Sequence, residues 1–393
     1  MDNDNFPVVL VDAVTRFLDT IKYDDQNYKR DERICNLHHV YTNAAAYFAQ
    51  PAQQQLIQAR NTSPNSLQAS LQTISAMIVS SWVHVDQDVM VDLTIHFTVI
   101  AMLDDDTADK PAETMGTFYE DLVQGNPQRH LWWQILNDHL PVLLRHYGPY
   151  CGLNIVRCTT NFFQGCWIER HSFQGFPGCY DFPGFLRRMT GLGQCVGGTM
   201  FPSGQFDEEA LFTEITSVIA NMEIWTGYVN DLLSFYKESD QLHDQTSLIN
   251  NHAQCDGITL DEALEKVTRE TIYSSQQLIN VFAGRDDSIV AVLKSFCQGY
   301  VTWHLSDPRY RMDELASKTA AYVSAAATTT RGDIDSSGRN VVEICNRFYS
   351  FWEAANDVGA VEPTKWAYPL VAELAKDAAK GVMGGLVVQP QIE

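Results

Sequence analysis

The stretch "LFTEITSVIANMEIWTGYVNDLLSFYKE", residues 211–238, decides the fold class. Its apolar side chains recur at helical spacing, and no proline interrupts them. These side chains are Ile215, Val218, Ile219, Met222 and Trp225. The stretch therefore predicts a long, buried α-helix.

The rest of the chain repeats this pattern. Periodic apolar segments cover residues 66–83, 91–103, 261–282 and 288–305, and clusters of Gly and Pro separate the long segments. Strand signals are weak, and nothing marks a domain boundary. The sequence predicts an all-α fold, with one domain over 1–393 and helices around a central apolar active-site cavity.

Two regions lack these helical features. Residues 320–340 are small and polar, so we expect a mobile surface loop there. We also expect loosely ordered termini, because chain ends are ordered only when other elements hold them.

Composition limits the possible functions. Of the 393 residues, 45% are hydrophobic and 19% are charged, which allows a sizeable core. The net charge of −22 repels phosphate backbones and anionic lipid, so it argues against nucleic-acid and membrane-surface roles. Nine Cys without a C-x-x-C motif, and no apolar run of about 18 residues, predict a cytoplasmic protein without membrane insertion.

Three oxygen-bearing side chains recur every four residues near the end of the opening stretch. Asn230, Ser234 and Glu238 would form one stripe on a helix, about 6 Å apart along its axis. An amide oxygen, a hydroxyl and one carboxylate suit a hard cation such as Mg²⁺. A solvated helix face is the plain alternative.

A second acidic stretch, "MLDDDTADKP" (102–111), ends an apolar segment. Carboxylates at a helix C-terminus oppose the macrodipole and repel one another, and a bound cation would relieve both costs. Asp105, Asp106 and Asp109 spell the D-D-x-x-D pattern that holds Mg²⁺ against a diphosphate. An acidic turn is the alternative for this stretch alone. The two motifs together, however, are specific for a site that holds Mg²⁺ against a diphosphate.

Basic residues are scarce and therefore informative. "FLRRMTG" contains Arg187 and Arg188, "DPRYRM" contains Arg309 and Tyr310, and Lys237 lies inside the first motif. Guanidinium groups and a phenol suit the oxygens of a diphosphate. Structural ion pairing with the many acidic residues is the alternative.

The motifs resemble those of class I terpene cyclases. Longer segments resemble the fungal trichodiene synthase family: "NYKRDERICNLHHVYTNAAAYFAQPAQQQLI", "FLRRMTGLGQCVGG", "NDLLSFYKE", "GYVTWHLSDPRYRM" and "WAYPLVAELA". The resemblance implies the class I terpenoid synthase fold, farnesyl diphosphate as substrate and diphosphate as a product. It also implies a cluster of three Mg²⁺ ions and a homodimer.

The resemblance also assigns metal ligands. Asn230, Ser234 and Glu238 would chelate one Mg²⁺, and the first Asp of the acidic motif would bridge the other two. Helix register makes that residue Asp104, whereas the D-D-x-x-D pattern makes it Asp105 and includes Asp109.

Other residues take their roles from the same resemblance. Arg187 would sense the diphosphate, while Lys237, Arg309 and Tyr310 would donate hydrogen bonds to it. Glu169 in "GCWIER" would be a further metal contact.

The carbocation formed by ionisation needs an apolar, water-poor cavity. Phe97, Phe162, Tyr300 and Trp303 are candidate wall residues, with ring faces that attract cations. Core packing is the alternative for each. Thr190 stands where trichodiene synthases have Asn, so the product is expected to be either a hydrocarbon such as trichodiene or an alcohol such as longiborneol.

Other classes fit less well. A chain-elongating prenyltransferase would carry a second D-D-x-x-D, and a binding protein of this fold would be expected to have lost metal ligands. A di-iron bundle would need E-x-x-H, which the sequence lacks. "GLGQCVGG" (191–198) has the wrong glycine spacing for a dinucleotide site.

Overall fold

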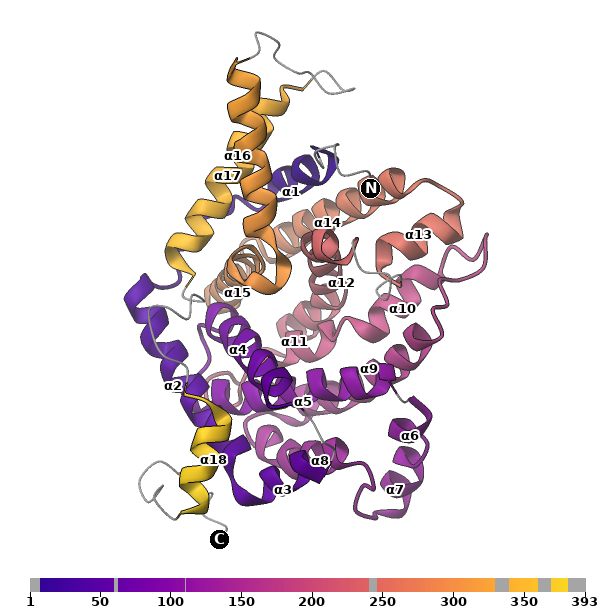
Figure 1. Ribbon diagram of the computed structural model, residues 1–393, viewed down its shortest axis with the longest axis vertical. Helices are drawn as coiled ribbons and strands as arrows, with labels where there is room; N and C mark the ends of the chain where they lie inside the picture. The colour runs from indigo at the N-terminus through magenta and orange to yellow at the C-terminus, as the bar shows by residue number, and fades with distance from the viewer. Residues whose placement is uncertain are drawn as a thin grey trace.

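The computed structural model of the chain describes residues 8–59, 63–109, 111–239, 246–328, 339–359 and 369–380. Throughout those ranges the regular structure is helical, without a β-strand (Figure 1). The prediction of an all-α fold is confirmed.

Several helices run around the middle of the molecule (Figure 1). They are α4 (Pro64–Ser81), α5 (Gln87–Asp109), α9 (Pro149–Arg170), α10 (Phe182–Thr190), α11 (Gly193–Thr199), α12 (Phe212–Glu238), α14 (Leu260–Phe282) and α15 (Asp287–Ser306). Helix α5 packs on α4 and α9, and α15 packs on α4 and α12. Aromatic side chains such as Trp82, Trp225 and Phe296 are buried where these helices meet.

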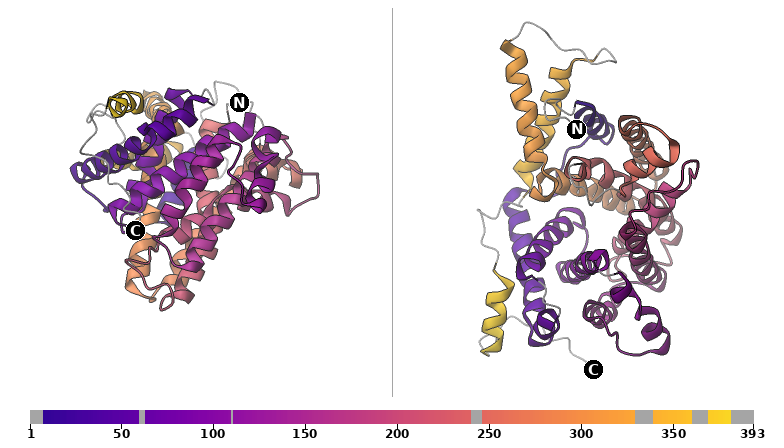
Figure 2. Two further views of the ribbon diagram at one scale, coloured as in Figure 1. Left: turned by 90° about the horizontal axis from the view of Figure 1, so that it is seen from below. Right: turned by 45° about the vertical axis from the view of Figure 1, so that its right-hand side comes forward.

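The other helices surround this middle part. They are α1 (Val8–Thr20), α2 (Arg30–Ala49), α3 (Pro51–Ala59), α6 (Pro111–Met115), α7 (Phe118–Gln124), α8 (Leu131–Leu144), α13 (Leu248–Asp256), the 3-10 helix η1 (Pro308–Tyr310), α16 (Met312–Thr328), α17 (Val341–Val358) and α18 (Val371–Ala379). Helices α16 and α17 pack side by side and project from the body (Figures 1 and 2).

The helices predicted from periodicity are present. The segments 211–238, 66–83, 91–103, 261–282 and 288–305 correspond to α12, α4, α5, α14 and α15. Helix α5 extends beyond its predicted end and includes the acidic stretch as far as Asp109. The acidic motif therefore occupies the last turns of a helix, as its sequence indicated.

The prediction of a loop over 320–340 is wrong for residues 320–328. Helix α16 continues to Thr328, because its alanines have the highest helix propensity and its side packs on α17. Residues 329–338 lie outside the described part of the chain, as do the terminal residues 1–7 and 381–393.

The glycines of "GLGQCVGG" permit close packing of α11 on α12. A Cβ atom on Gly193 would lie 2.4 Å from the carbonyl oxygen of Met222, and one on Gly197 would lie 2.8 Å from the Cα of Ile219. The segment is a helix with glycine at its contact face, which agrees with the rejection of a dinucleotide site.

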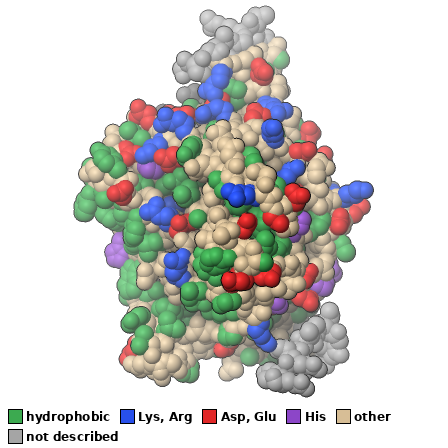
Figure 3. Space-filling view, turned by 180° about the vertical axis from the view of Figure 1, so that it is seen from behind, with side chains coloured by type: hydrophobic (Ala, Val, Ile, Leu, Met, Phe, Trp, Pro, Cys, Tyr) green, Lys and Arg blue, Asp and Glu red, His purple; other side chains and the backbone are tan. Residues whose placement is uncertain are grey.

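The described surface carries charges of both signs. On the face in Figure 3, Lys and Arg side chains are interspersed with Asp and Glu and do not form a single basic patch. Among the described helices, none has the length and apolarity to cross a bilayer. All nine Cys are free thiols.

Candidate active site

The first oxygen motif lies in the last turns of α12. Ser234 is 1% exposed, and its Oγ has no hydrogen-bond partner in the described part of the chain. Asn230 and Glu238 are half-buried one turn away on either side, and the Nζ of Lys237 lies 3.9 Å from Glu238 Oε1. A buried hydroxyl without a partner is costly, so a ligand for this oxygen would stabilise it.

The Asn230 amide is bound on two sides. Its Oδ1 accepts a hydrogen bond of 2.8 Å from Arg187 Nη2, and its Nδ2 lies 3.1 Å from His304 Nε2. His304 Nδ1 lies 2.8 Å from the carbonyl oxygen of Tyr300. Burial lowers the pKa of His304 to about 3, so this imidazole is neutral.

Arg187 connects α10 to α12. Its Nη2 also donates to the carbonyl oxygen of Gly227 at 3.1 Å, and its Nε forms an ion pair of 2.5 Å with Asp231. Asp231 in turn accepts a hydrogen bond of 3.0 Å from the Leu248 backbone N–H. Burial opposes the charge of Arg187, but nearby carboxylates, Asp231 foremost, raise its pKa. The neighbouring Arg188 is exposed.

The acidic end of α5 faces both α9 and the segment after α15. Burial raises the pKa of the Cys166 thiol on α9, and the charges of Asp104 and Glu169 raise it further. Desolvation opposes the charge of Arg309, whose surface is still partly exposed, but Tyr310, Asp307, Asp104 and Asp105 raise its pKa. The two acidic residues therefore lie within electrostatic range of a guanidinium from a distant segment.

The two candidate first ligands differ in exposure. Asp104 is half-buried and hydrogen-bonded to the Cys166 thiol, whereas Asp105 is exposed. Asp104 also lies on the α5 face that carries Phe97 and Ile100, at helical steps of three and four. Asp109 is the last residue of α5, and its side chain is outside the described part of the structure.

Asp307 holds the segment that presents Arg309 and Tyr310. It caps η1 by accepting a hydrogen bond of 2.9 Å from the Arg309 backbone N–H. Its other oxygen accepts from Thr73 at 2.7 Å and from Trp303 Nε1 at 3.2 Å. Burial raises the pKa of Tyr310 well above its usual value, so its hydroxyl remains a hydrogen-bond donor.

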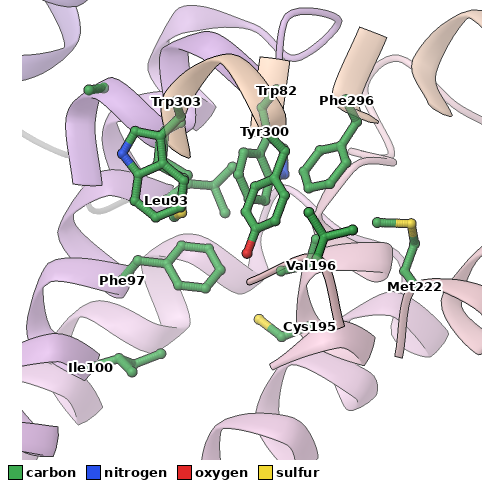
Figure 4. Close-up of a cluster of buried hydrophobic side chains, with 14 of the residues drawn as sticks. Trp82, Leu93, Phe97, Ile100, Cys195, Val196, Met222, Phe296, Tyr300 and Trp303 are labelled. Carbon is green, nitrogen blue, oxygen red and sulfur yellow. The ribbon is translucent and has the colours of Figure 1, made fainter. Parts of the chain in front are cut away.

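An apolar cluster lies beside these polar groups. Figure 4 shows Phe97, Tyr300 and Trp303 converging from α5 and α15, with the Tyr300 hydroxyl pointing between Phe97 and Val196. The ring centroids of Tyr300 and Trp303 are 5.6 Å apart. Phe162 lies on α9, and the centroid of its ring is 5.2 Å from that of Phe163.

Comparison with known proteins identifies the family. A family model described as Trichodiene synthase (TRI5) matches residues 5–387. The chain belongs to the trichodiene synthase family. The trichodiene synthase of Fusarium poae is 47% identical over 380 residues, which cover 96% of this chain and 95% of that protein. The trichodiene synthase of Stachybotrys chartarum is 49% identical over 361 residues, which cover 92% of this chain and 88% of that protein.

The residues of this site fit the Mg²⁺ on which enzymes of the trichodiene synthase family typically depend. The available donors are oxygens, as a hard cation prefers. They combine the Ser234 hydroxyl and the Asn230 amide with carboxylates of Glu238, Asp104 and Glu169. The Ser234 hydroxyl, which is buried without a hydrogen-bond partner among the described residues, is an oxygen that such a cation would satisfy.

Two positioning groups were missed by sequence reasoning. Asp231, which pairs with Arg187, stands inside the trichodiene synthase motif "NDLLSFYKE", next to Asn230. His304, which contacts Asn230, follows the candidate wall residue Trp303. Their place beside predicted site residues was the available signal, but the partners come from other helices.

Proposed function

We propose that this protein ionises farnesyl diphosphate and cyclises the resulting carbocation to a sesquiterpene, with release of diphosphate. It is thus a carbon–oxygen lyase, a sesquiterpene cyclase of the trichodiene synthase family. The observation that carries the proposal is the contact of Arg187 with Asn230 beside an apolar aromatic cluster. Anion-binding and metal-binding groups thus adjoin a wall suited to a prenyl chain.

Metal ligands come from three helices in this proposal. Asn230, Ser234 and Glu238 would hold one Mg²⁺, and Asp104 at the end of α5 would be a ligand for two more. Asp105 and Asp109 complete the acidic motif, and Glu169 on α9 is a further contact. The burial of Asp104 supports its choice over Asp105 as the first ligand. Bound Mg²⁺ supplies positive charge that stabilises the leaving diphosphate.

The chain's own donors bind the same diphosphate. Arg187, Lys237, Arg309 and Tyr310 donate hydrogen bonds to its oxygens as the C–O bond breaks, which stabilises the developing charge. Both guanidinium groups are charged, as Arg side chains are in proteins, and nearby groups raise the pKa of Arg187 and Arg309 further. The fixed position of these donors avoids reorganisation during ionisation.

Aromatic side chains protect the cation. Phe97, Phe162, Tyr300 and Trp303 form the cavity wall, exclude water and offer ring faces to passing positive charge. Loss of a proton from the final cation yields a hydrocarbon such as trichodiene, and capture of water yields an alcohol such as longiborneol. Thr190, whose Oγ1 lies 3.5 Å from Arg187 Nη1, is a position where product specificity can differ from that of relatives.

The family also supports proposals about the domain organisation, oligomeric state and cellular location of the protein. We propose that residues 1–393 form one cyclase domain, which the match over 5–387 supports. A homodimer in the cytoplasm is proposed on the same basis, and nine free thiols suit a reducing compartment. Sedimentation velocity tests the dimer.

One experiment separates cyclisation from the alternative functions of this fold. The purified protein is given Mg²⁺ and farnesyl diphosphate, with or without isopentenyl diphosphate. A cyclase releases one diphosphate per substrate and leaves isopentenyl diphosphate unused. A prenyltransferase would consume isopentenyl diphosphate and form a longer prenyl diphosphate, while a binding protein would release nothing.

A further inference from the structure

The amide of Asn230 has a hydrogen-bond partner at each end. Arg187 Nη2 contacts the Oδ1 end at 2.8 Å, and His304 Nε2 contacts the Nδ2 end at 3.1 Å. An amide oxygen can bind Mg²⁺, but an amide nitrogen is a poor ligand for a hard cation. The orientation of this amide therefore decides whether it can serve as a ligand.

Both contacts have a fixed polarity. A guanidinium has donors only, so the atom facing Arg187 must be the oxygen. A backbone carbonyl only accepts, so His304 Nδ1, which lies 2.8 Å from the Tyr300 oxygen, carries the hydrogen. Since Arg187 fixes the oxygen end, the group facing His304 Nε2 is the Asn230 NH₂, which only donates, so Nε2 is the acceptor of this contact.

Aromatic rings hold His304 in place. The centroid of its imidazole lies 4.5 Å from those of Tyr300 and Trp303 and 4.4 Å from that of Tyr310. Its side chain is fully buried. A flipped Asn230 amide would set its NH₂ group against the donors of Arg187 and its oxygen against the hydrogen-free Nε2 of His304.

We propose that His304 is a positioning residue that orients the Asn230 amide, so that Oδ1 is presented to Mg²⁺. The chain of hydrogen bonds runs from the Tyr300 carbonyl through the imidazole to Asn230 Nδ2. This inference rests on the proposed function, because that function makes Asn230 a metal ligand. It assigns a role to a residue outside the metal and diphosphate motifs.

Two substitutions separate the hydrogen-bonding role of Nε2 from that of Nδ1. His304→Gln places an amide oxygen near the Nε2 position and keeps an acceptor for Asn230. His304→Asn keeps a donor for the Tyr300 carbonyl but is too short to reach Asn230. Both variants remove the same imidazole ring from the aromatic cluster and replace it with an amide. Each therefore controls for the packing loss of the other.

The measurement is Mg²⁺ binding in the presence of inorganic diphosphate, by isothermal titration calorimetry on the full chain. Loss of an outer-shell partner typically weakens metal binding by about 10- to 100-fold. We expect such a loss in His304→Asn and binding within about threefold of wild type in His304→Gln. Thermal melts of both variants record the packing cost, which should be similar.

Equal weakening in the two variants, or unchanged affinity in His304→Asn, would overturn the positioning role. Wild-type turnover of farnesyl diphosphate is measured in parallel. If the wild type turns over farnesyl diphosphate but the two variants bind Mg²⁺ equally, this inference alone is overturned. If the variants differ in Mg²⁺ affinity but the wild type has no turnover, the proposed function alone is overturned. A wild type that binds no Mg²⁺ with diphosphate overturns both.

A second readout does not depend on the folding of His304→Asn. Nitrogen-15 chemical shifts of labelled histidine distinguish Nδ1–H from Nε2–H tautomers, and loss of one signal in His304→Gln assigns the residue. We expect His304 to be neutral with its hydrogen on Nδ1. A hydrogen on Nε2 would contradict the proposal, because that nitrogen could not accept from Asn230.

Discussion

Arg187 and Asn230 share a hydrogen bond of 2.8 Å between Nη2 and Oδ1, although 43 positions separate them in the chain. The bond joins a guanidinium proposed for the diphosphate to an amide proposed for Mg²⁺. Because Asn230 Oδ1 both accepts from Arg187 and is the atom proposed to bind Mg²⁺, diphosphate binding and metal binding should depend on each other.

Substitution of the carboxylate in the first motif should stop turnover. Glu238→Gln keeps size and hydrogen bonding but removes the charge that binds a divalent cation, so we expect kcat to fall at least about 100-fold. Asn230→Ala should have a similar effect. Steady-state assays measure the loss, and circular dichroism should show an intact fold. Glu214→Gln, in the first turn of the same helix, is the matched control and should retain activity.

Removal of the charge of Asp231 should destabilise the protein. This buried carboxylate lies 2.5 Å from Arg187 Nε, so Asp231→Asn leaves a guanidinium without its main counter-charge. Breaking a buried ion pair costs about 3 kcal/mol in the free energy of unfolding. Urea titration measures this change. Asp377→Asn, which removes an exposed partner of Lys380, should have a much smaller effect. Equal effects would show that the Arg187 pair is not structural.

A methyl group at Gly227 should displace Arg187. The added Cβ would lie 3.1 Å from Arg187 Nε and 3.3 Å from its Cγ, so the side chain must shift by a few tenths of an ångström. We expect kcat/KM for farnesyl diphosphate to fall about tenfold in Gly227→Ala. Gly204→Ala is the control, since nothing lies within 4 Å of its Cβ position. Equal kinetics in both variants would mean that the position of Arg187 is not critical.

Buried histidine should make stability depend on pH. Burial lowers the pKa of His96 to about 3 from its usual 6.5. The unfolded state therefore binds the extra proton between those values. The stabilising contribution is complete above pH 6.5 and falls as the pH drops toward 3, by up to about 1.4 kcal/mol per pH unit for one proton. Urea titrations from pH 5 to 7 should show a shallower dependence in His96→Gln than in wild type. The same slope in both would contradict the prediction.

Local patterns predicted the helices that carry the site. The spacing of Ile215, Val218 and Met222 reports one buried face, and a helix of that length follows from sequence periodicity alone. The same logic placed Asn230, Ser234 and Glu238 on neighbouring turns. The small residues at the end of α16 predict a loop, but this end is helical because Ala favours helix.

Contacts between distant segments were not predictable in this way. The pairing of Asp231 with Arg187, and that of His304 with Asn230, depend on how α10, α12 and α15 pack. Periodicity shows which face of a helix is buried but not which side chain it meets. The roles of these two residues could therefore be derived only from three-dimensional contacts.

The most direct test of the account is the reaction itself. Purified protein is incubated with farnesyl diphosphate and Mg²⁺, with and without excess chelator, and the organic extract is read by gas chromatography–mass spectrometry. The account predicts a cyclic sesquiterpene hydrocarbon or alcohol that disappears with chelator and returns when Mg²⁺ is restored. No cyclic product from farnesyl diphosphate, or a product formed equally well without divalent metal, would contradict it.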